Sequence, residues 1–167
     1  MADLVSAMGI ASASIYAAFG SKEDLFREAV SLYKTGEGGF ADRAFKEEPT
    51  ARRAIERMLR DAVETYTRPG RPHGCMVVQS ATNYSEGNEA VAKWMAGHRR
   101  ARTASIVARL QKAQADGELA ENANTQALGD YFAVFLHGLS VQARDGVPKE
   151  RLLALIPSVM QALGPGK

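Results

Sequence analysis

The sequence has a single cysteine, Cys75, and no long apolar run. One cysteine excludes an internal disulfide framework and fits a reducing compartment. No stretch approaches the roughly 18 apolar residues that a membrane-spanning helix needs. The first residues also lack the basic region and apolar run of a signal peptide. We therefore expect a cytoplasmic protein with no membrane partner.

The sequence also lacks a clear excess of either sign of charge, because 21 basic and 19 acidic side chains leave a formal net charge of +2. Bulk charge therefore gives no indication of nucleic acid as a partner, and any contact with DNA needs a local patch. The hydrophobic content of 46% is average for a globular protein and allows a packed core.

Motifs of catalysis are absent too. We find no phosphate-binding glycine loop, no nucleophile motif and no paired carboxylates at a recognisable spacing. His73, His98 and His137 show no metal-ligand spacing with Cys75 or with carboxylates. We expect no enzymatic activity, no cofactor and no metal.

Apolar residues recur at helical spacing along the whole chain, with no convincing alternating strand, and this predicts an all-α fold. Ser21 and Thr50 are expected N-caps, and residues 36–39 are expected to interrupt the chain. We expect helices over residues 2–8 and about 12–19, then one that starts at Ser21 and runs through Tyr33, and one that Thr50 caps and that residues 69–72 end. Further helices are expected over residues 74–84, which are short and buried, and over about 88–115, 125–143 and 148 onward.

The first two helices flank a tight glycine turn, which is the arrangement of a helix-turn-helix. In such a motif the first helix braces the second, whose exposed side lies in the major groove. Residues 2–10 fit the bracing helix and its turn, and residues 11–19 fit the reading helix. Spacing alone leaves an ordinary helical hairpin as an alternative.

Residues 9–25 narrow this choice. They contain a glycine turn, a serine before an Ile–Tyr pair, a phenylalanine three residues later, and then Ser-Lys-Glu and a leucine. The matching residues are Gly9, Ser14, Ile15, Tyr16, Phe19, Ser21, Lys22, Glu23 and Leu25. This pattern resembles the DNA-binding signature of the TetR/AcrR family of transcriptional regulators.

The resemblance implies a TetR-like fold, with a helix-turn-helix DNA-binding domain over residues 1–35. A helical ligand-binding and dimerisation domain would follow over residues 36–167. The function it implies is that of a DNA-binding transcriptional regulator, a ligand-responsive repressor that binds a palindromic operator in double-stranded DNA as a homodimer.

The side chains of the motif suggest separate roles in DNA binding. Ser14, Tyr16 and Lys22 suit phosphate oxygens, while Ile15 and Phe19 should face inward. The residues left to approach base edges are Ala11, Ser12, Ala13 and Ala17. Because these are small, we expect thin direct readout, by a hydroxyl and by methyl contacts with thymine. DNA shape and residues outside this chain would then contribute to sequence choice.

Two features depart from the family pattern. The family has a further, usually basic helix before the bracing helix, and this sequence begins without it, so we expect a truncated start or a variant. Residues 1–30 carry two basic and four acidic side chains, a net charge of 2 − 4 = −2, where a DNA-binding surface should be positive. The alternative is a dimeric small-molecule-binding or interaction module that no longer binds DNA.

In the family the ligand pocket lies between the central helices of the body. The candidate lining residues here are Met58, Tyr66, Cys75, Val78, Trp94, His98, Phe132 and Phe135. This mixture suits a small apolar or aromatic effector, and ordinary core packing stays open for each residue. The basic run of residues 98–102 is interpreted as a solvated face rather than a DNA contact.

The resemblance also implies that the last two helices pair with their twins in a homodimer. The helix over residues 125–143 has more apolar surface than a single buried face requires. The residues that give it this surface are Leu128, Tyr131, Phe132, Phe135, Leu136 and Leu139. A monomeric core around these residues is the alternative to a dimer.

Overall fold

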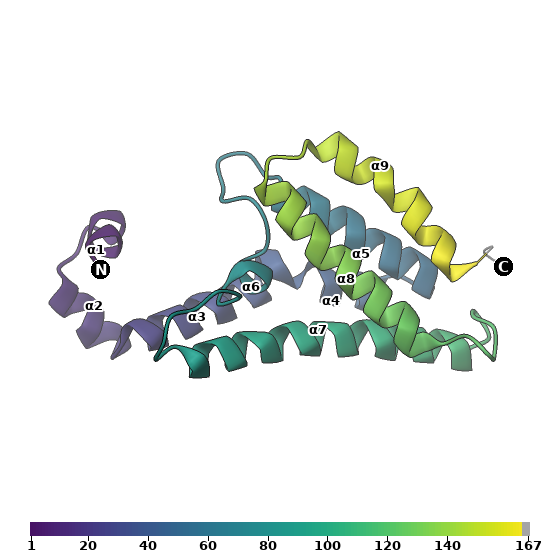
Figure 1. Ribbon diagram of the computed structural model, residues 1–167, viewed down its shortest axis with the longest axis horizontal. Coiled ribbons are helices and arrows are strands. Elements are labelled where there is room, and N and C mark those ends of the chain that lie inside the picture. Colours follow the sequence, from purple (N-terminus) through teal and green to yellow (C-terminus); the bar gives the residue numbers. More distant parts are fainter. Residues whose placement is uncertain (165–167) are drawn as a thin grey trace. The chain divides into compact units, whose positions relative to one another are not determined.

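The computed structural model describes residues 1–164, which are helical with no strand, so the all-α prediction is confirmed for that part of the chain (Figure 1). The chain forms two compact units, Met1–Gly36 and Glu37–Lys167. We call the first the reading unit and the second the body.

The reading unit contains three helices, α1 (Ala2–Met8), α2 (Ser12–Phe19) and α3 (Lys22–Thr35). Helix α1 ends at Gly9, whose φ of 67° is a left-handed conformation that favours glycine. Helix α3 begins at the predicted cap, because the Ser21 hydroxyl accepts a hydrogen bond of 3.0 Å from the backbone N–H of Asp24. Among residues 1–164 no single helix is long and apolar enough to cross a membrane; α1 and α2, bent by 87°, meet that test only when taken as a pair.

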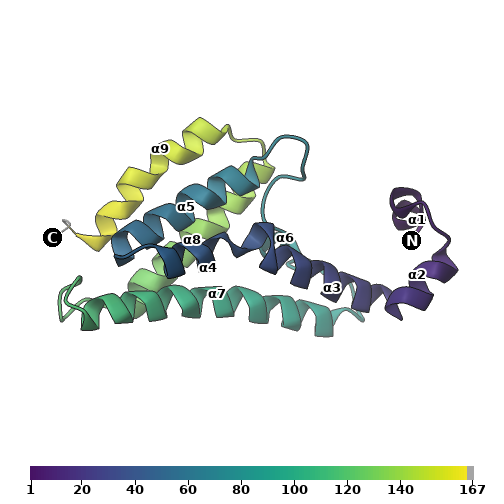
Figure 2. The same cartoon turned by 180° about the vertical axis from the view of Figure 1, so that it is seen from behind.

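The body is built around one helix, α5, against which α4, α7, α8 and α9 pack. Its elements are η1 (Glu37–Gly39), α4 (Phe40–Glu47), α5 (Ala51–Tyr66), α6 (Met76–Gln79), α7 (Glu89–Ala115), α8 (Thr125–Arg144), α9 (Lys149–Met160) and η2 (Gln161–Leu163). Helices α9, α5 and α8 lie side by side, and α7 runs along the opposite side of the body from α9 (Figures 1 and 2).

The core lies where these helices meet. Its largest fully buried side chains in the body are Ile55, Met58, Leu59, Tyr66, Met95, Ile106, Leu110, Phe132, Leu152 and Ile156. Burying an apolar side chain of this size contributes about 1.5–3 kcal/mol relative to leaving it exposed. The periodicity that predicted α5, α7 and α8 therefore also marks the face that each turns to the core.

Two predictions about local structure were wrong. Residues 36–39 do not simply interrupt the chain: η1 leads into α4, whose Phe40, Ala41 and Ala44 are buried. The helix expected over residues 74–84 has only four residues, none of them fully buried. It is short because the residues on either side of it, Cys75 and Ser80, have extended backbone.

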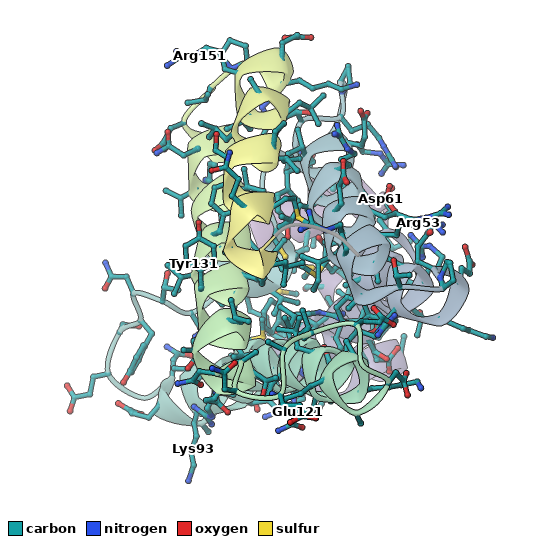
Figure 3. All side chains as sticks on the ribbon, turned by 90° about the vertical axis from the view of Figure 1, so that its right-hand side faces the viewer. Arg53, Asp61, Lys93, Glu121, Tyr131 and Arg151 are labelled. Atoms are coloured by element: carbon teal, nitrogen blue, oxygen red, sulfur yellow. The ribbon has the colours of Figure 1, made fainter. Side chains whose placement is uncertain are left out.

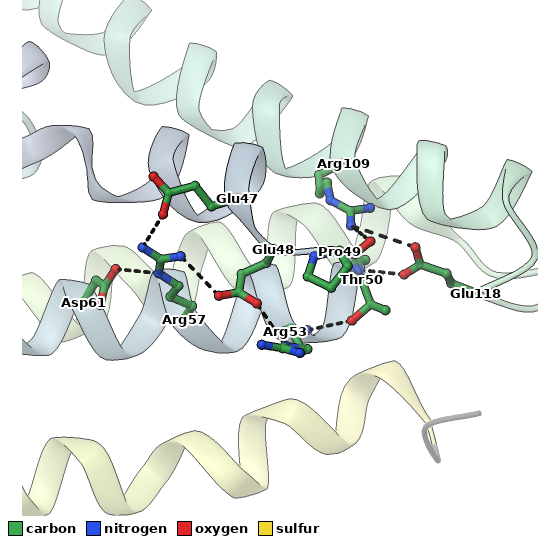
Figure 4. Close-up of polar contacts among 10 residues, drawn as sticks. Glu47, Glu48, Pro49, Thr50, Arg53, Arg57, Asp61, Arg109 and Glu118 are labelled. Atoms are coloured by element: carbon green, nitrogen blue, oxygen red, sulfur yellow. Dashed lines mark hydrogen bonds and ion pairs between the residues drawn. The ribbon is translucent and has the colours of Figure 1, made fainter.

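Ion pairs tie α4 and α7 to the start of α5 (Figure 4). The guanidinium of Arg57 contacts Glu47 at 2.7 Å and Glu48 at 3.1 Å. Hydrogen bonds from Arg57 to Glu47 and then to Glu48 raise the pKa of Arg57 above its usual value. Because these side chains are only partly removed from solvent, each pair contributes little on its own, and the network serves to fix the α4–α5 corner.

Candidate functional sites

Helices α1 and α2 have the geometry of a helix-turn-helix. They are bent by 87° relative to each other and are joined by a turn of three residues, Gly9, Ile10 and Ala11. Helix-turn-helix motifs cross at roughly 90–120° over a turn of 3–4 residues that often contains glycine. Helix α3 packs against α2 and so supports the second helix of the motif.

The side chains of α2 divide as the sequence predicted. Ile15 is 1% exposed and Phe19 is half-buried. All seven residues predicted to contact DNA are exposed: Ala11, Ser12, Ala13, Ser14, Tyr16, Ala17 and Lys22. They lie on α2, at its N-cap and at the first residue of α3, so one continuous segment presents the whole set.

The residues predicted to line an effector site come from helices of the body that pack on one another. Met58, Tyr66 and Phe132 are fully buried and Cys75 is 8% exposed, which makes them core side chains in this conformation. The half-buried members are Val78, Trp94, His98 and Phe135. Trp94 and His98 stack edge to face with ring centroids 4.5 Å apart. The half-buried set on α6, α7 and α8 is therefore the part that a ligand could reach first.

Helix α6 is held by hydrogen bonds to its neighbours, and sequence reasoning missed the residues that make them. The hydroxyl of Ser140 accepts the backbone N–H of Cys75 at 2.8 Å, and the Gln79 amide donates to the Ser140 carbonyl at 2.9 Å. From α7, Arg99 donates to the carbonyls of Val77 and Ser80, both at 3.1 Å. These bonds fasten α6 to α8 on one side and to α7 on the other.

The basic run on α7 is mostly engaged within the body, so its interpretation as a solvated face was wrong for two of its three arginines. Arg99 holds α6, as above. Arg102 forms a two-pronged ion pair with Asp42 of α4, at 2.7 and 3.1 Å. Only Arg100 is exposed. Charge pattern alone could not show this, because each partner is distant in sequence.

His137 lies on α8 close enough to Arg99 to feel its charge. Burial, and secondarily the Arg99 guanidinium, lower the pKa of His137 from its ordinary value of 6.5. Both effects favour the neutral imidazole. Among the described residues, no three His, Cys, Asp or Glu side chains come together in a way that could hold a metal ion.

Comparison with known proteins gives the same two-part division. Residues 1–29 match the model of bacterial regulatory proteins of the tetR family, and residues 35–147 match that of the tetracyclin repressor-like C-terminal domain. Among curated proteins, the HTH-type transcriptional repressor ComR of Escherichia coli K12 is 24% identical over 162 residues, which are 96% of this chain and 77% of ComR.

Two solved structures are similar over nearly the whole chain. One is the TetR family transcriptional regulator CifR, a cysteine mutant in complex with a 26-bp double-strand operator DNA. It is 38% identical with a TM-score of 0.93, covering 99% of this chain and 86% of CifR. The other is a putative TetR transcriptional regulator from Rhodococcus sp. RHA1, 34% identical with a TM-score of 0.71, covering 99% and 88% of the two chains.

The lowered pKa of His137 predicts a dependence of stability on pH. The unfolded chain binds a proton at His137 at a higher pH than the folded chain does. The neutral imidazole therefore contributes its full stability above pH 6.5, and this contribution is lost as the pH falls through the lowered pKa of the folded state. We expect Arg99→Gln to raise the pKa of His137 in an NMR titration and to weaken this acid dependence of the unfolding free energy. Arg100→Gln, at an exposed neighbour, is the control, and an equal pKa rise in both variants would contradict the assignment.

Proposed function

Because this chain belongs to the TetR family of bacterial regulatory proteins, it is a transcriptional regulator, and we propose that it represses transcription as a homodimer bound to a palindromic operator. The observation that carries the proposal is the helix-turn-helix geometry of α1 and α2 with an exposed second helix. The operator-bound relative with 38% identity supports it.

In the proposed complex α2 lies in the major groove. Ser14, Tyr16 and Lys22 contact phosphates and set the position of the helix on the duplex. The residues that face base edges are Ala11, Ser12, Ala13 and Ala17. The proposal needs these four side chains to be exposed, and all of them are.

Selection of bound duplexes from a random-sequence DNA pool tests this proposal. We expect an inverted repeat with half-sites about one helical turn, roughly 34–36 Å, apart. Ala17→Glu, which adds a negative charge to the exposed face of α2, should abolish the selected binding, whereas Ala104→Glu on the exposed side of α7 should not. Failure to enrich any palindrome at low salt would favour the dimeric module that does not bind DNA.

The proposed dimer interface follows from an apolar stripe on the outer side of α8. The stripe consists of residues three and four apart, all exposed: Ala127, Tyr131, Val134, Gly138 and Val141. Val134 is 70% exposed and Tyr131 45%, which is unusual for side chains that recur on one face. A Cβ on Gly138 would meet nothing within 4 Å, so a second helix could approach closely there.

Helix α9 extends this surface. It packs beside α8, as Figure 3 shows from the end of the body, where Tyr131 is labelled. Leu155 of α9 is 47% exposed, and its exposed neighbours Ala154 and Ser158 are small. Together the two helices offer a self-complementary face, which is what a two-fold interface requires.

Val134→Glu should therefore convert the dimer to a monomer. Burying a carboxylate against its twin across a two-fold axis leaves two unpaired charges in an apolar interface, which costs several kcal/mol. Sedimentation equilibrium measures the outcome, with Ala104→Glu as the matched variant that keeps the dimer. A Val134→Glu protein that stays dimeric would place the interface elsewhere.

We further propose that a small apolar or aromatic effector binds among the half-buried residues of α6, α7 and α8 and weakens operator binding. A ligand shifts such an equilibrium only by its difference in affinity for the two conformations. The elements around α6 are suited to such a change of conformation, because hydrogen bonds rather than buried side chains hold that helix.

Trp94 is the only tryptophan, so its fluorescence reports on this region directly. In a titration with a panel of uncharged aromatic compounds, we expect at least one to change the Trp94 emission and to release the selected operator at the same concentrations. Phe135→Ala should weaken both effects together. A compound that releases DNA with no change at Trp94, and equally from Phe135→Ala, would place the effector site elsewhere.

A further inference from the structure

We infer that the effector is a small organic monoanion, an apolar or aromatic body that carries one carboxylate, and that Arg99 of α7 binds the carboxylate. The inference rests on the effector site proposed above and names the chemical class that this site takes. Two independent observations carry it. One is the hydrogen-bond geometry of the Arg99 guanidinium, and the other is the lack of carboxylates in the helices around it.

The Arg99 guanidinium uses only one of its nitrogens within the described part of the protein. Its Nη1 donates to the carbonyls of Val77 and Ser80, both at 3.1 Å, whereas Nε and Nη2 donate no hydrogen bond to a described residue. Solvent reaches Nε and Nη2, because no buried nitrogen of Arg99 lacks a hydrogen-bond partner. Two adjacent nitrogens of a guanidinium hold the two oxygens of a carboxylate in parallel hydrogen bonds, so this edge is suited to an anion.

The positive charge of Arg99 has no counter-ion among residues 1–164. The sequence explains this, because the segments around Arg99 contain neither aspartate nor glutamate. These segments are residues 75–85, which include α6, residues 90–115 of α7 and residues 131–144 of α8. A half-buried cation in such surroundings attracts an anion, because the protein itself supplies none.

Carboxylates on the other nearby helices are already engaged. One turn further along α7, Arg102 takes both oxygens of Asp42 from α4. The three carboxylates of α5 each form an ion pair with a cation other than Arg99. The pairs are Glu56 with Arg60, Asp61 with Arg57, and Glu64 with Lys149. The Arg99 charge is therefore left for a ligand.

The effect of this charge is seen on the facing helix. The pKa of His137 on α8 is lowered by burial and then by the Arg99 guanidinium. A carboxylate beside Arg99 would act on the imidazole with the opposite sign. The positive charge thus extends from α7 to α8, between which α6 is held.

The apolar part of the effector is matched by side chains on the same three elements. Val78 of α6, Trp94 of α7 and Phe135 of α8 are half-buried. Trp94 precedes Arg99 by five residues, about 7.5 Å along the helix axis, which is comparable to the length of a substituted benzoate. One guanidinium edge and one charge suit a monocarboxylate. A dianion would leave a second negative charge without a partner, which is unfavourable in a half-buried site.

Matched pairs of compounds test the inference. Phenylacetate, benzoate and octanoate are each compared with the corresponding primary amide, at neutral pH, for binding to the full chain by calorimetry and by Trp94 emission. Hydrogen bonds between charged groups are stronger than those between neutral groups, so we expect at least one carboxylate to bind roughly ten-fold or more tightly than its amide.

Variants of the arginines assign this preference to one side chain. Arg99→Gln should bind acid and amide with equal affinity, Arg99→Lys should keep part of the preference, and Arg100→Gln, at an exposed neighbour, should keep all of it. The ratio within each pair is the measured quantity, because a loosening of α6 in Arg99→Gln would weaken the binding of acid and amide alike.

The pKa of His137 gives a readout that does not depend on affinity. A bound carboxylate opposes the Arg99 charge, so saturation with the acid should raise the pKa of His137 in an NMR titration, and saturation with the amide should not.

Equal affinities for acid and amide in the unmodified chain would overturn the inference and leave the proposed effector site standing. The same is true of an Arg99→Gln variant that keeps the full preference. If no compound of the panel, charged or neutral, bound or changed the Trp94 emission, the proposed effector site would fall, and this inference with it.

Discussion

Eight of the 16 residues of α5 are buried, and four other helices of the body pack against it. A helix buried to this extent keeps only a narrow strip for charged side chains, and on α5 that strip is filled by ion pairs. Arg57 meets Asp61 and Arg60 meets Glu56 one turn away. The rest of the body follows from this constraint, because each neighbouring helix must turn an apolar face to α5.

The two ends of α5 are secured by residues far away in sequence. At its start, the Glu118 carboxylate accepts the backbone N–H of Ala51 at 2.6 Å, and the buried Arg109 lies 3.9 Å from the same carboxylate (Figure 4). At its end, the Tyr66 carbonyl accepts the N–H of Gly74 at 2.9 Å. A buried charge pair of this kind adds little net stability, but removing one partner would leave the other as an unpaired buried charge.

The hydrogen bond between Gly74 and Tyr66 at the end of α5 requires glycine at position 74. Its φ of +86° is left-handed, and a Cβ there would lie 2.8 Å from the carbonyl oxygen of Ser140. The turn can therefore approach α8 closely enough for Ser140 to bond Cys75 and Gln79. The same residues that close the end of α5 thus position α6 between α7 and α8.

Helix ends and core faces could be predicted from the sequence because they depend on local chemistry. Ser21 and Thr50 cap α3 and α5 as expected, and the spacing of apolar residues identified the core of α5. The prediction failed at α4, where four residues of glycine-rich sequence precede a buried helix, and at α6, where an apolar composition was mistaken for burial. Periodicity indicates that a face is apolar but does not say what covers it.

The two candidate sites differ in the same way, because one is set by local sequence and the other by tertiary packing. The exposed set on α2 depends on local spacing, and the structure places all of it at the surface. The effector set depends on how four helices pack, and three of its members are fully buried in the core. The partners of Arg99 and Arg102 are 19–60 residues away, and a charge pattern on one helix holds no information about contacts over such separations.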